Sequence, residues 1–232
     1  MEELRERAEK LGIRLSKGQI ESFDIFYNEL TEWNEKFNLT SIKEKHDVLE
    51  KHFLDSLTII PYLPEDAHRI IDIGAGAGFP GLPIKIAKPE LNVTLTDSTG
   101  KKVNFMNNVI DKLGIKGVMA INNRAEEIGQ SDRYREKFDV AIARAVAYLP
   151  VLCEYTLPLV RVGGLFIAQK AISESEVEDS KRAIDILGGR IKEIVKIDLA
   201  GLTDRQLIII EKVRETPDEF PRLPGLPKQN PL

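Results

Sequence analysis

Apolar residues recur at steps of three and four over much of the first 60 positions, which is the periodicity of amphipathic helices. One helix is predicted from an apolar stripe that consists of Ile20, Phe23, Tyr27, Leu30, Trp33 and Phe37. A second is predicted from Glu44 to Ile60, before Pro61 and Pro64, with inward positions at Val48, Leu49, Phe53, Leu57 and Ile60. The aromatic stripe is typical of core packing rather than of base stacking. Residues 1–65 are therefore expected to form an N-terminal helical subdomain.

From Arg69 the pattern changes to short apolar strands that alternate with helical stretches. The predicted strands cover 69–73, 91–96, 117–122, 138–143, 163–169, 191–199 and 205–212. The predicted helices cover 81–88, 100–114, 125–129, 147–160 and 173–187. Such alternation, with β-branched residues in the strands, indicates an α/β domain with a doubly wound, mostly parallel sheet over residues 66–214.

The last two predicted strands are separated only by residues 201–204, which is too short for a helix. They are expected to pair as a hairpin, so that the seven-stranded sheet contains one antiparallel strand near its end. Beyond them, residues 215–232 form a tail that carries five of the 12 prolines. Because proline cannot occupy the interior of a helix or strand, the tail is expected to contain neither. Its Arg222 and Lys228 leave open an extended arm on RNA or on the domain surface.

Composition limits the protein class. With 232 residues, 42% apolar and 30% charged, the chain fits one sizeable domain with a smaller addition and a well-solvated surface. No apolar run reaches 18 residues and the N-terminus is charged, so neither a membrane span nor a signal peptide is expected, and a cytoplasmic location is predicted. The single cysteine, Cys153, gives no disulfide, and the three histidines match no metal spacing, so no metal is expected. The net charge of −4 argues against a generic nucleic-acid binder unless the basic residues gather on one face.

The segment from Ile70 to Gly81 is the strongest chemical signal, because a short apolar strand runs into Asp72 and then into alternating glycines. Glycine permits positive φ and lets the backbone approach a ligand closely. The segment fits two cofactors: it contains a dinucleotide G-x-G-x-x-G from Gly76 to Gly81, and also the D-x-G-x-G-x-G pattern of S-adenosylmethionine (SAM) pockets from Asp72 to Gly78. Asp72 favours SAM, because a carboxylate repels a pyrophosphate but attracts an ammonium and a sulfonium. Asp97, at the end of the next strand, can accept ribose hydroxyls from either cofactor.

Cationic side chains follow several strands at their carboxyl ends, the edge where open α/β sheets bind ligands. Arg124, Arg144 and Lys170 each follow one predicted strand, and Lys101 and Lys102 open the helix after Asp97. Their convergence suggests an anionic substrate such as a phosphate backbone. Ala125 and Glu126 stand where a SAM pocket recognises adenine, although Glu126 equally suits an exposed first turn of a helix.

Several catalytic signatures are absent from the sequence. It has no Pro-Cys pair for attack on a pyrimidine and no Asn/Asp-Pro-Pro-Tyr/Phe run that would hold an exocyclic amine. An acceptor that is already nucleophilic, such as guanine N7, needs neither group, because its in-plane lone pair attacks the methyl directly. Positioning and electrostatics would then supply the rate, and no catalytic base is assigned.

With these residues in view, the chain resembles the RsmG (GidB) family, bacterial small-subunit rRNA guanine-N7 methyltransferases. The resemblance is carried, in order, by residues 33–40, 52–57, 72–81, 97–102, 124–127, 142–145 and 220–225. It implies a Rossmann-like SAM-dependent methyltransferase sheet with an N-terminal helical extension. It also implies methylation of N7 of guanosine 527 in the 530 loop of 16S rRNA, in the small ribosomal subunit or a precursor of it.

The resemblance also implies site residues. Those at SAM-contacting positions are Gly74, Phe79, Ala125, Glu126 and Arg144, joined by Asp72, Gly76 and Asp97 from the motif itself. Those expected to face RNA are Arg124, Lys170, Lys101 and Lys102. Two competing functions stay open, a nicotinamide-dependent oxidoreductase and a non-catalytic nucleotide-binding module.

Overall fold

The computed structural model describes residues 1–144, 147–171, 174–198 and 205–232. Its seven strands form one sheet in the order β3-β2-β1-β4-β5-β7-β6. The strands are β1 (Arg69–Ile73), β2 (Asn92–Asp97), β3 (Val118–Asn122), β4 (Phe138–Arg144), β5 (Val160–Lys170), β6 (Gly189–Lys196) and β7 (Gln206–Lys212). Pairs among β1 to β5 are parallel, whereas β7 is antiparallel to both β5 and β6. The predicted doubly wound sheet with one antiparallel strand is confirmed.

The reversed strand is not at the edge of the sheet. β7 lies between β5 and β6, and the edge position is taken by β6, whose register against β7 shifts between Ile191 and Glu193. The residues 201–204, predicted to connect the two strands, lie outside the described residues. β5 begins at Val160, three residues before its predicted start, because the preceding helix ends early.

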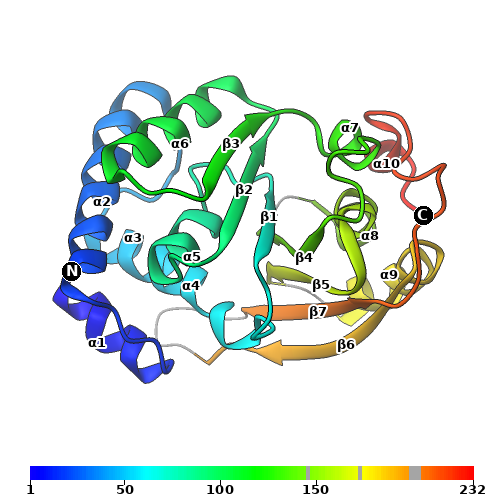
Figure 1. The fold of residues 1–232 in the computed structure, drawn as a ribbon, viewed down its shortest axis with the longest axis horizontal. Coiled ribbons are helices and arrows are strands. Elements are labelled where there is room, and N and C mark those ends of the chain that lie inside the picture. Colours follow the sequence, from blue (N-terminus) through cyan, green and yellow to red (C-terminus); the bar gives the residue numbers. More distant parts are fainter. Residues whose placement is uncertain (145–146, 172–173, 199–204) are drawn as a thin grey trace.

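Helices cover both faces of the sheet (Figure 1). They are α5 (Gly81–Ala87), α6 (Gly100–Leu113), α7 (Ala125–Gly129), α8 (Leu149–Thr156) with the 3₁₀ turn η3 (Leu157–Leu159), α9 (Glu174–Ile186) and α10 (Leu226–Gln229). In Figure 1, α5 and α6 lie with the N-terminal helices on one side of the sheet, and α7, α8 and α9 on the other. The apolar core is correspondingly divided into two clusters, one on each face.

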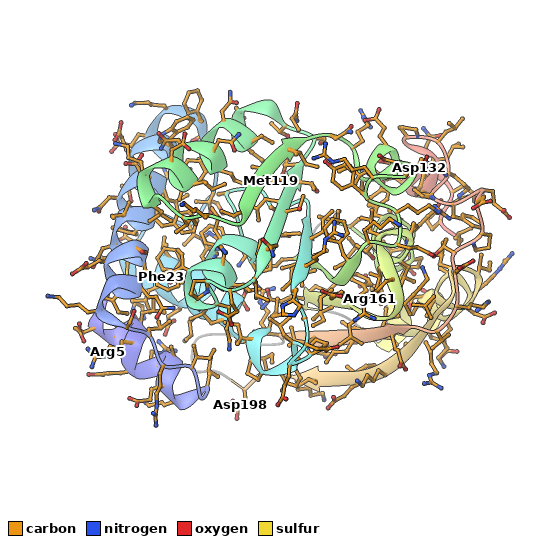
Figure 2. The ribbon with its side chains drawn as sticks, in the orientation of Figure 1. Arg5, Phe23, Met119, Asp132, Arg161 and Asp198 are labelled. Atoms are coloured by element: carbon orange, nitrogen blue, oxygen red, sulfur yellow. The ribbon has the colours of Figure 1, made fainter. Side chains whose placement is uncertain are left out.

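The N-terminal region begins with α1 (Glu2–Lys10) and α2 (Lys17–Phe37). α2 starts with a capping box, in which Ser16 Oγ accepts from Gln19 N at 3.3 Å and Gln19 Oε1 accepts from Ser16 N at 2.8 Å. The aromatic stripe packs inward as predicted at Phe23, which is fully buried and labelled in Figure 2, but the stripe is wrong at its end: Phe37 is 38% exposed. Phe26, outside the predicted stripe, is fully buried instead.

The second predicted helix is not regular. Its parts are α3 (Lys45–Val48), a π-helical turn η1 (Leu49–Leu54), α4 (Asp55–Leu57) and a 3₁₀ turn η2 (Ile60–Tyr62). The carbonyls in and beside the wide turn accept from side chains: Lys51 O from Arg144 at 3.1 Å and His52 O from Ser56 Oγ at 2.6 Å. π turns of this kind are rare and are often found at functional sites. The predicted inward positions of this helix are nevertheless all buried.

The N-terminal helices and one face of the sheet share a single apolar cluster, which extends from Leu4 to Ile209. The division into a helical subdomain over 1–65 and a sheet domain over 66–214 stays a prediction. The tail differs from expectation, because α10 lies within it. Its Pro227 occupies the first turn of the helix, where a missing N–H costs no hydrogen bond, and Gly225 precedes it at φ +91°.

Candidate cofactor and substrate site

The glycine-rich turn follows β1 and is built from left-handed backbone. Gly74, Gly76 and Gly78 have φ values of 70°, 62° and 88°, which L side chains rarely adopt. The turn is tied to β2 by two hydrogen bonds: Ala75 N donates to Thr96 O at 2.8 Å and Gly76 N donates to Asp97 Oδ2 at 3.1 Å. A Cβ added at Gly76 would meet only Gly74 O, at 4.0 Å, so the glycine there faces open space.

Asp72 lies beneath this turn. Its side chain is fully buried, and its Oδ2 accepts from Gly81 N at 2.8 Å while its Oδ1 has no hydrogen-bond partner. Gly81 is required at this approach, because a Cβ there would lie 2.8 Å from Asp72 Oδ2 and 2.3 Å from Leu95 Cδ2. Burial raises the pKa of Asp72 to about 7, and the hydrogen bond from Gly81 and the charge of Arg144 only partly oppose this rise.

A cavity of about 150 Å³ opens at the carboxyl ends of β1, β2 and β3. Five residues named from the sequence line it: Gly74, Asp97, Arg124, Ala125 and Glu126. The other lining residues are Ile73, Thr96, Ser98, Asn123 and Tyr155. Tyr155 comes from α8 on the far side of the cavity, and no local pattern in the sequence marked it. The structure thus brings four of the predicted cofactor-binding residues, Gly74, Asp97, Ala125 and Glu126, together in this cavity.

Asp97 organises the floor of this cavity. It is 6% exposed, and in addition to Gly76 N it accepts from Thr99 N at 2.8 Å and forms an ion pair with Lys102 at 3.3 Å. The carboxylate therefore fixes the turn, the start of α6 and one predicted RNA-facing lysine at once. Its remaining acceptor capacity is available to a ligand that enters the cavity.

Phe79 and Arg144 form a second group, which is buried against the N-terminal region rather than lining the cavity. The guanidinium of Arg144 lies over the Phe79 ring at 5.1 Å and donates to Asp55 Oδ2 at 3.2 Å and to His52 Nδ1 at 3.1 Å. Burial lowers the pKa of Arg144 and raises that of Asp55, and the attraction between the two charges opposes both shifts. The ion pair thus joins the carboxyl end of β4 to the first residue of α4, directly after the π turn.

His52 completes this group. Its Nε2 lies 2.9 Å from Thr40 Oγ1, and its Nδ1 lies 3.1 Å from both Arg144, which can only donate, and Lys51 O, which can only accept. Burial, followed by the charge of Arg144, lowers the pKa of His52 to about 3. The sequence indicated no role for Asp55, which lies beside His52 in this group.

Gln169 extends the same group onto β5. Its Nε2 donates to Asp55 O at 2.6 Å, Asp55 Oδ1 at 3.1 Å and Thr58 Oγ1 at 3.1 Å, and its fully buried Oε1 has no partner. Arg205 Nε lies 3.4 Å from Asp55 Oδ1. Asp55 and Gln169 were missed by sequence reasoning. The sequence signal that could have found them is the presence of a polar side chain, a carboxylate in one case and an amide in the other, within an apolar segment.

The predicted RNA-facing cations differ in how they are placed. Arg124 is exposed at the rim of the cavity, and Lys101 is exposed with its Nζ 3.3 Å from Phe37 O. Lys102 is half-buried in its ion pair with Asp97. Lys170 is 12% exposed, donates to Ala147 O at 2.9 Å and is paired with Glu176. Arg124 and Lys101 thus face solvent, whereas Lys170 faces the protein.

Comparison with known proteins identifies the chain. The model of the family "GidB: rRNA small subunit methyltransferase G" matches residues 19–208. The chain belongs to this family. A ribosomal RNA small subunit methyltransferase G of Acetivibrio thermocellus is 48% identical over 228 residues, covering 98% of this chain and 94% of the relative. One of Bacillus cereus is 45% identical over 235 residues, covering 100% of this chain and 98% of the relative.

Solved structures agree with the methyltransferase fold of the family. A putative methyltransferase in complex with the Haloferax volcanii Trm112 activator superposes with a TM-score of 0.58 at 12% identity, covering 80% of this chain and 98% of that one. A ribosomal protein L11 methylase of Lactobacillus delbrueckii subsp. bulgaricus gives 0.55 at 14% identity, covering 71% of this chain and 79% of that one. Among the helices of the described residues, none has the length and apolar character needed to cross a membrane.

The residues present fit the SAM expected for this family. The turn offers open space at Gly76, the cavity holds an acceptor at Asp97, and the buried Asp72 Oδ1 beneath the turn has no partner. Such acceptors suit a ligand that carries hydroxyls and positive charge.

Within the described part of the chain, one group of three residues has spacing that a metal could use: Glu3, His46 and Glu50. Arg7 lies within ion-pair distance of both glutamates, so a cation already balances their charge. We assign no metal to the site.

Proposed function

We propose that this protein uses SAM to methylate N7 of guanosine 527 in 16S rRNA, within the small ribosomal subunit or a precursor of it. The observation that carries the proposal is the cavity at the carboxyl ends of β1 to β3, which unites Gly74, Asp97, Ala125 and Glu126 with the exposed Arg124 at its rim. Its support comes from the family, whose curated relatives are named for methylation of small-subunit rRNA.

The glycine-rich turn, Asp97 and Asp72 would hold the cofactor. The left-handed turn from Gly74 to Gly78 admits close backbone approach, and Asp97 accepts from ribose hydroxyls. Asp72 provides an unpartnered carboxylate oxygen beneath the turn, which a positive charge nearby would stabilise in its ionised form. When bound, SAM supplies an electrophilic methyl group on a sulfonium.

Guanine N7 presents a lone pair in the plane of the base and carries no proton, so its methylation needs no general base. The protein's task is then to position the base and to exclude water. The surroundings support this division of labour: Cys153, the single thiol of the chain, is fully buried in α8, and burial raises its pKa, which removes it as a nucleophile. Arg124 at the cavity rim offers a charge-assisted contact to an RNA phosphate.

The competing functions make different predictions. An oxidoreductase would bind NAD, and a non-catalytic module would bind a nucleotide without transferring a methyl group. The family membership favours neither. A cytoplasmic location accords with an rRNA substrate and forms part of the proposal.

The test combines binding with product mapping. The protein is incubated with small ribosomal subunits or 16S rRNA and methyl-labelled SAM, and the RNA is digested and mapped by mass spectrometry. We expect one methyl group at N7 of guanosine 527, together with a higher melting temperature in S-adenosylhomocysteine (SAH) but not in NAD. Stabilisation by NAD, methylation at another atom, or SAH binding without any methylated RNA would each overturn the proposal.

A further inference from the structure

The C-terminal segment, residues 216–232, is held firmly on the face of the sheet that carries α7 and α8. At its start, Thr216 N donates to Glu136 Oε1 at 2.9 Å and Thr216 Oγ1 donates to Leu187 O at 2.7 Å. The guanidinium of Arg135 then donates to Thr216 O at 2.7 Å and to Phe220 O at 2.6 Å. Thr216 and Phe220 are both buried, so the segment leaves β7 as part of the packed structure.

The end of α7 is shaped to receive this segment. Gly129 lies directly against Pro221, and a Cβ at Gly129 would come within 2.6 Å of Pro221 Cγ. The next residue, Gln130, donates through Nε2 to Pro221 O at 2.8 Å. α7 carries Ala125 and Glu126 at its other end, and both line the cavity. The segment therefore packs against the helix that forms one wall of the cavity.

A buried ion pair anchors the middle of the segment. Arg222 donates to Glu154 three times, from its backbone N at 2.8 Å and from Nε and an Nη at 2.9 Å and 2.6 Å. Glu154 lies on α8 and is fully buried, and Arg222 supplies the opposite charge beside it. Such a fork-shaped contact fixes orientation as well as distance.

The segment then contacts Glu126, which lines the cavity. Gly225 N donates to Glu126 Oε1 at 2.9 Å, and Glu126 is only 5% exposed. The hydroxyl of Tyr155 lies beside the same carboxylate: burial of the ring and the charge of Glu126 raise the pKa of Tyr155 to about 12. Glu126 and Tyr155 both line the cavity. The hydrogen bond from Gly225, 99 residues along the chain from Glu126, therefore holds one wall of the cavity in place.

We propose that the C-terminal segment completes the adenosine end of the cofactor cavity, and that Glu126 is a positioning residue that holds Gly225 and Tyr155. The inference rests on the proposed function, since it takes SAM as the occupant of the cavity. The family resemblance counts Glu126 among SAM-contacting positions. In this structure its carboxylate is engaged by the protein, so recognition at this position is left to the backbone of Ala125 and Glu126.

The proposal predicts that a change in the segment outside the cavity weakens cofactor binding. Arg222 does not line the cavity, and Arg222→Lys keeps its positive charge while removing the fork that orients the segment. Glu126→Ala removes the contact with Gly225, and Glu126→Gln keeps an acceptor for it. The SAH dissociation constant is measured by calorimetry, well below the melting temperature of each variant, so that lower stability alone does not change the result.

We expect SAH affinity to fall about fivefold in Arg222→Lys and about tenfold in Glu126→Ala, the scale of one buried hydrogen bond. Glu126→Gln should retain most of the affinity. Adding Arg222→Lys to Glu126→Ala should cause no further loss, because both act through one contact. Lys228→Ala, a change at an exposed cation of the same segment, serves as the matched control and should bind as the unaltered protein does.

Unchanged SAH affinity in Arg222→Lys, or fully additive losses in the double variant, would each overturn the inference. Failure of the unaltered protein to bind SAH is a different outcome, because it refutes the proposed function and removes the inference with it. Hydrogen exchange gives a second measurement. The amide of Gly225 should exchange more slowly when SAH is bound, and an exchange rate indifferent to SAH would contradict the proposal.

Discussion

The imidazole of His52 is stacked on the ring of Phe79, with the ring centroids 4.4 Å apart and the planes inclined by 20°. One ring comes from the π turn of the N-terminal region and the other from the glycine-rich turn after β1. The Arg144 guanidinium also lies over Phe79, so that a cation and a neutral imidazole both contact this ring. The N-terminal helices are therefore part of the structure that supports the cofactor turn.

Stability should depend on His52 in acid. Its pKa is lowered to about 3 in the folded protein from an ordinary 6.5, so its contribution is complete above pH 6.5 and is lost as pH falls from there toward 3. By pH 5 this should amount to about 2 kcal/mol. His52→Asn cannot take up the proton. The difference in the free energy of unfolding between the two proteins, measured by urea titration, should shrink over this range; a constant difference would show that His52 is not buried as described.

Asp72 should produce the opposite dependence. Its pKa is raised to about 7 from 3.8, so its protonated form stabilises the fold, and that contribution is lost as pH rises from about 4 to 7. Asp72→Asn keeps an acceptor for Gly81 N–H and removes the buried charge. In the ligand-free protein the variant should gain on the order of 2 kcal/mol over the original between pH 4 and 6. Parallel stability curves for the two proteins would refute this account of Asp72.

The glycine-rich turn offers a test with a matched control. Gly74→Val places a branched side chain at φ 70°, beside the cavity, and SAH affinity should fall at least about tenfold. Gly12→Val imposes similar strain at φ 76°, in open space that does not line the cavity. Both variants should lose comparable stability in thermal unfolding, but only Gly74→Val should lose binding in calorimetry. Equal SAH affinities in the two variants would place the cofactor elsewhere.

Arg124 and Lys170 should now behave differently in RNA binding. Arg124 is exposed at the cavity rim, so Arg124→Ala should weaken RNA binding and reduce its salt dependence by about one phosphate contact. Lys170 is paired with Glu176, so Lys170→Ala should lower the melting temperature and leave the salt dependence unchanged. Filter binding over a series of salt concentrations separates the two effects. If Lys170→Ala lowered the salt dependence of RNA binding, Lys170 would have to contact RNA.

The features predicted correctly from the sequence are those encoded locally. The alternation of strands and helices and the place of the glycine-rich turn directly after β1 each depend on short stretches of chain. The cavity residues could be named because strands 1 to 3 of a parallel sheet end at one edge.

The missed features depend on distant partners. The tail was expected to contain no helix, but it is ordered by contacts such as that of Arg222 with Glu154, 68 residues away. Lys170 is paired with Glu176, six residues along the chain, a contact that no strand or helix pattern indicates, and its contact with RNA stays a prediction. The π turn depends on side chains that accept or donate across the fold, such as Arg144 at Lys51 O, and no apolar periodicity encodes it.

The position of β7 inside the sheet has a consequence for association between copies. It leaves β6 as the outer strand, with unpaired backbone groups along one side. That strand carries the exposed residues Arg190, Lys192, Glu193 and Lys196, and its register is broken between Ile191 and Glu193. Charges and an irregular register both oppose the addition of another strand. The sheet is thus guarded against edge-to-edge aggregation at this side, and the hydrogen-bonding capacity of β6 stays with solvent.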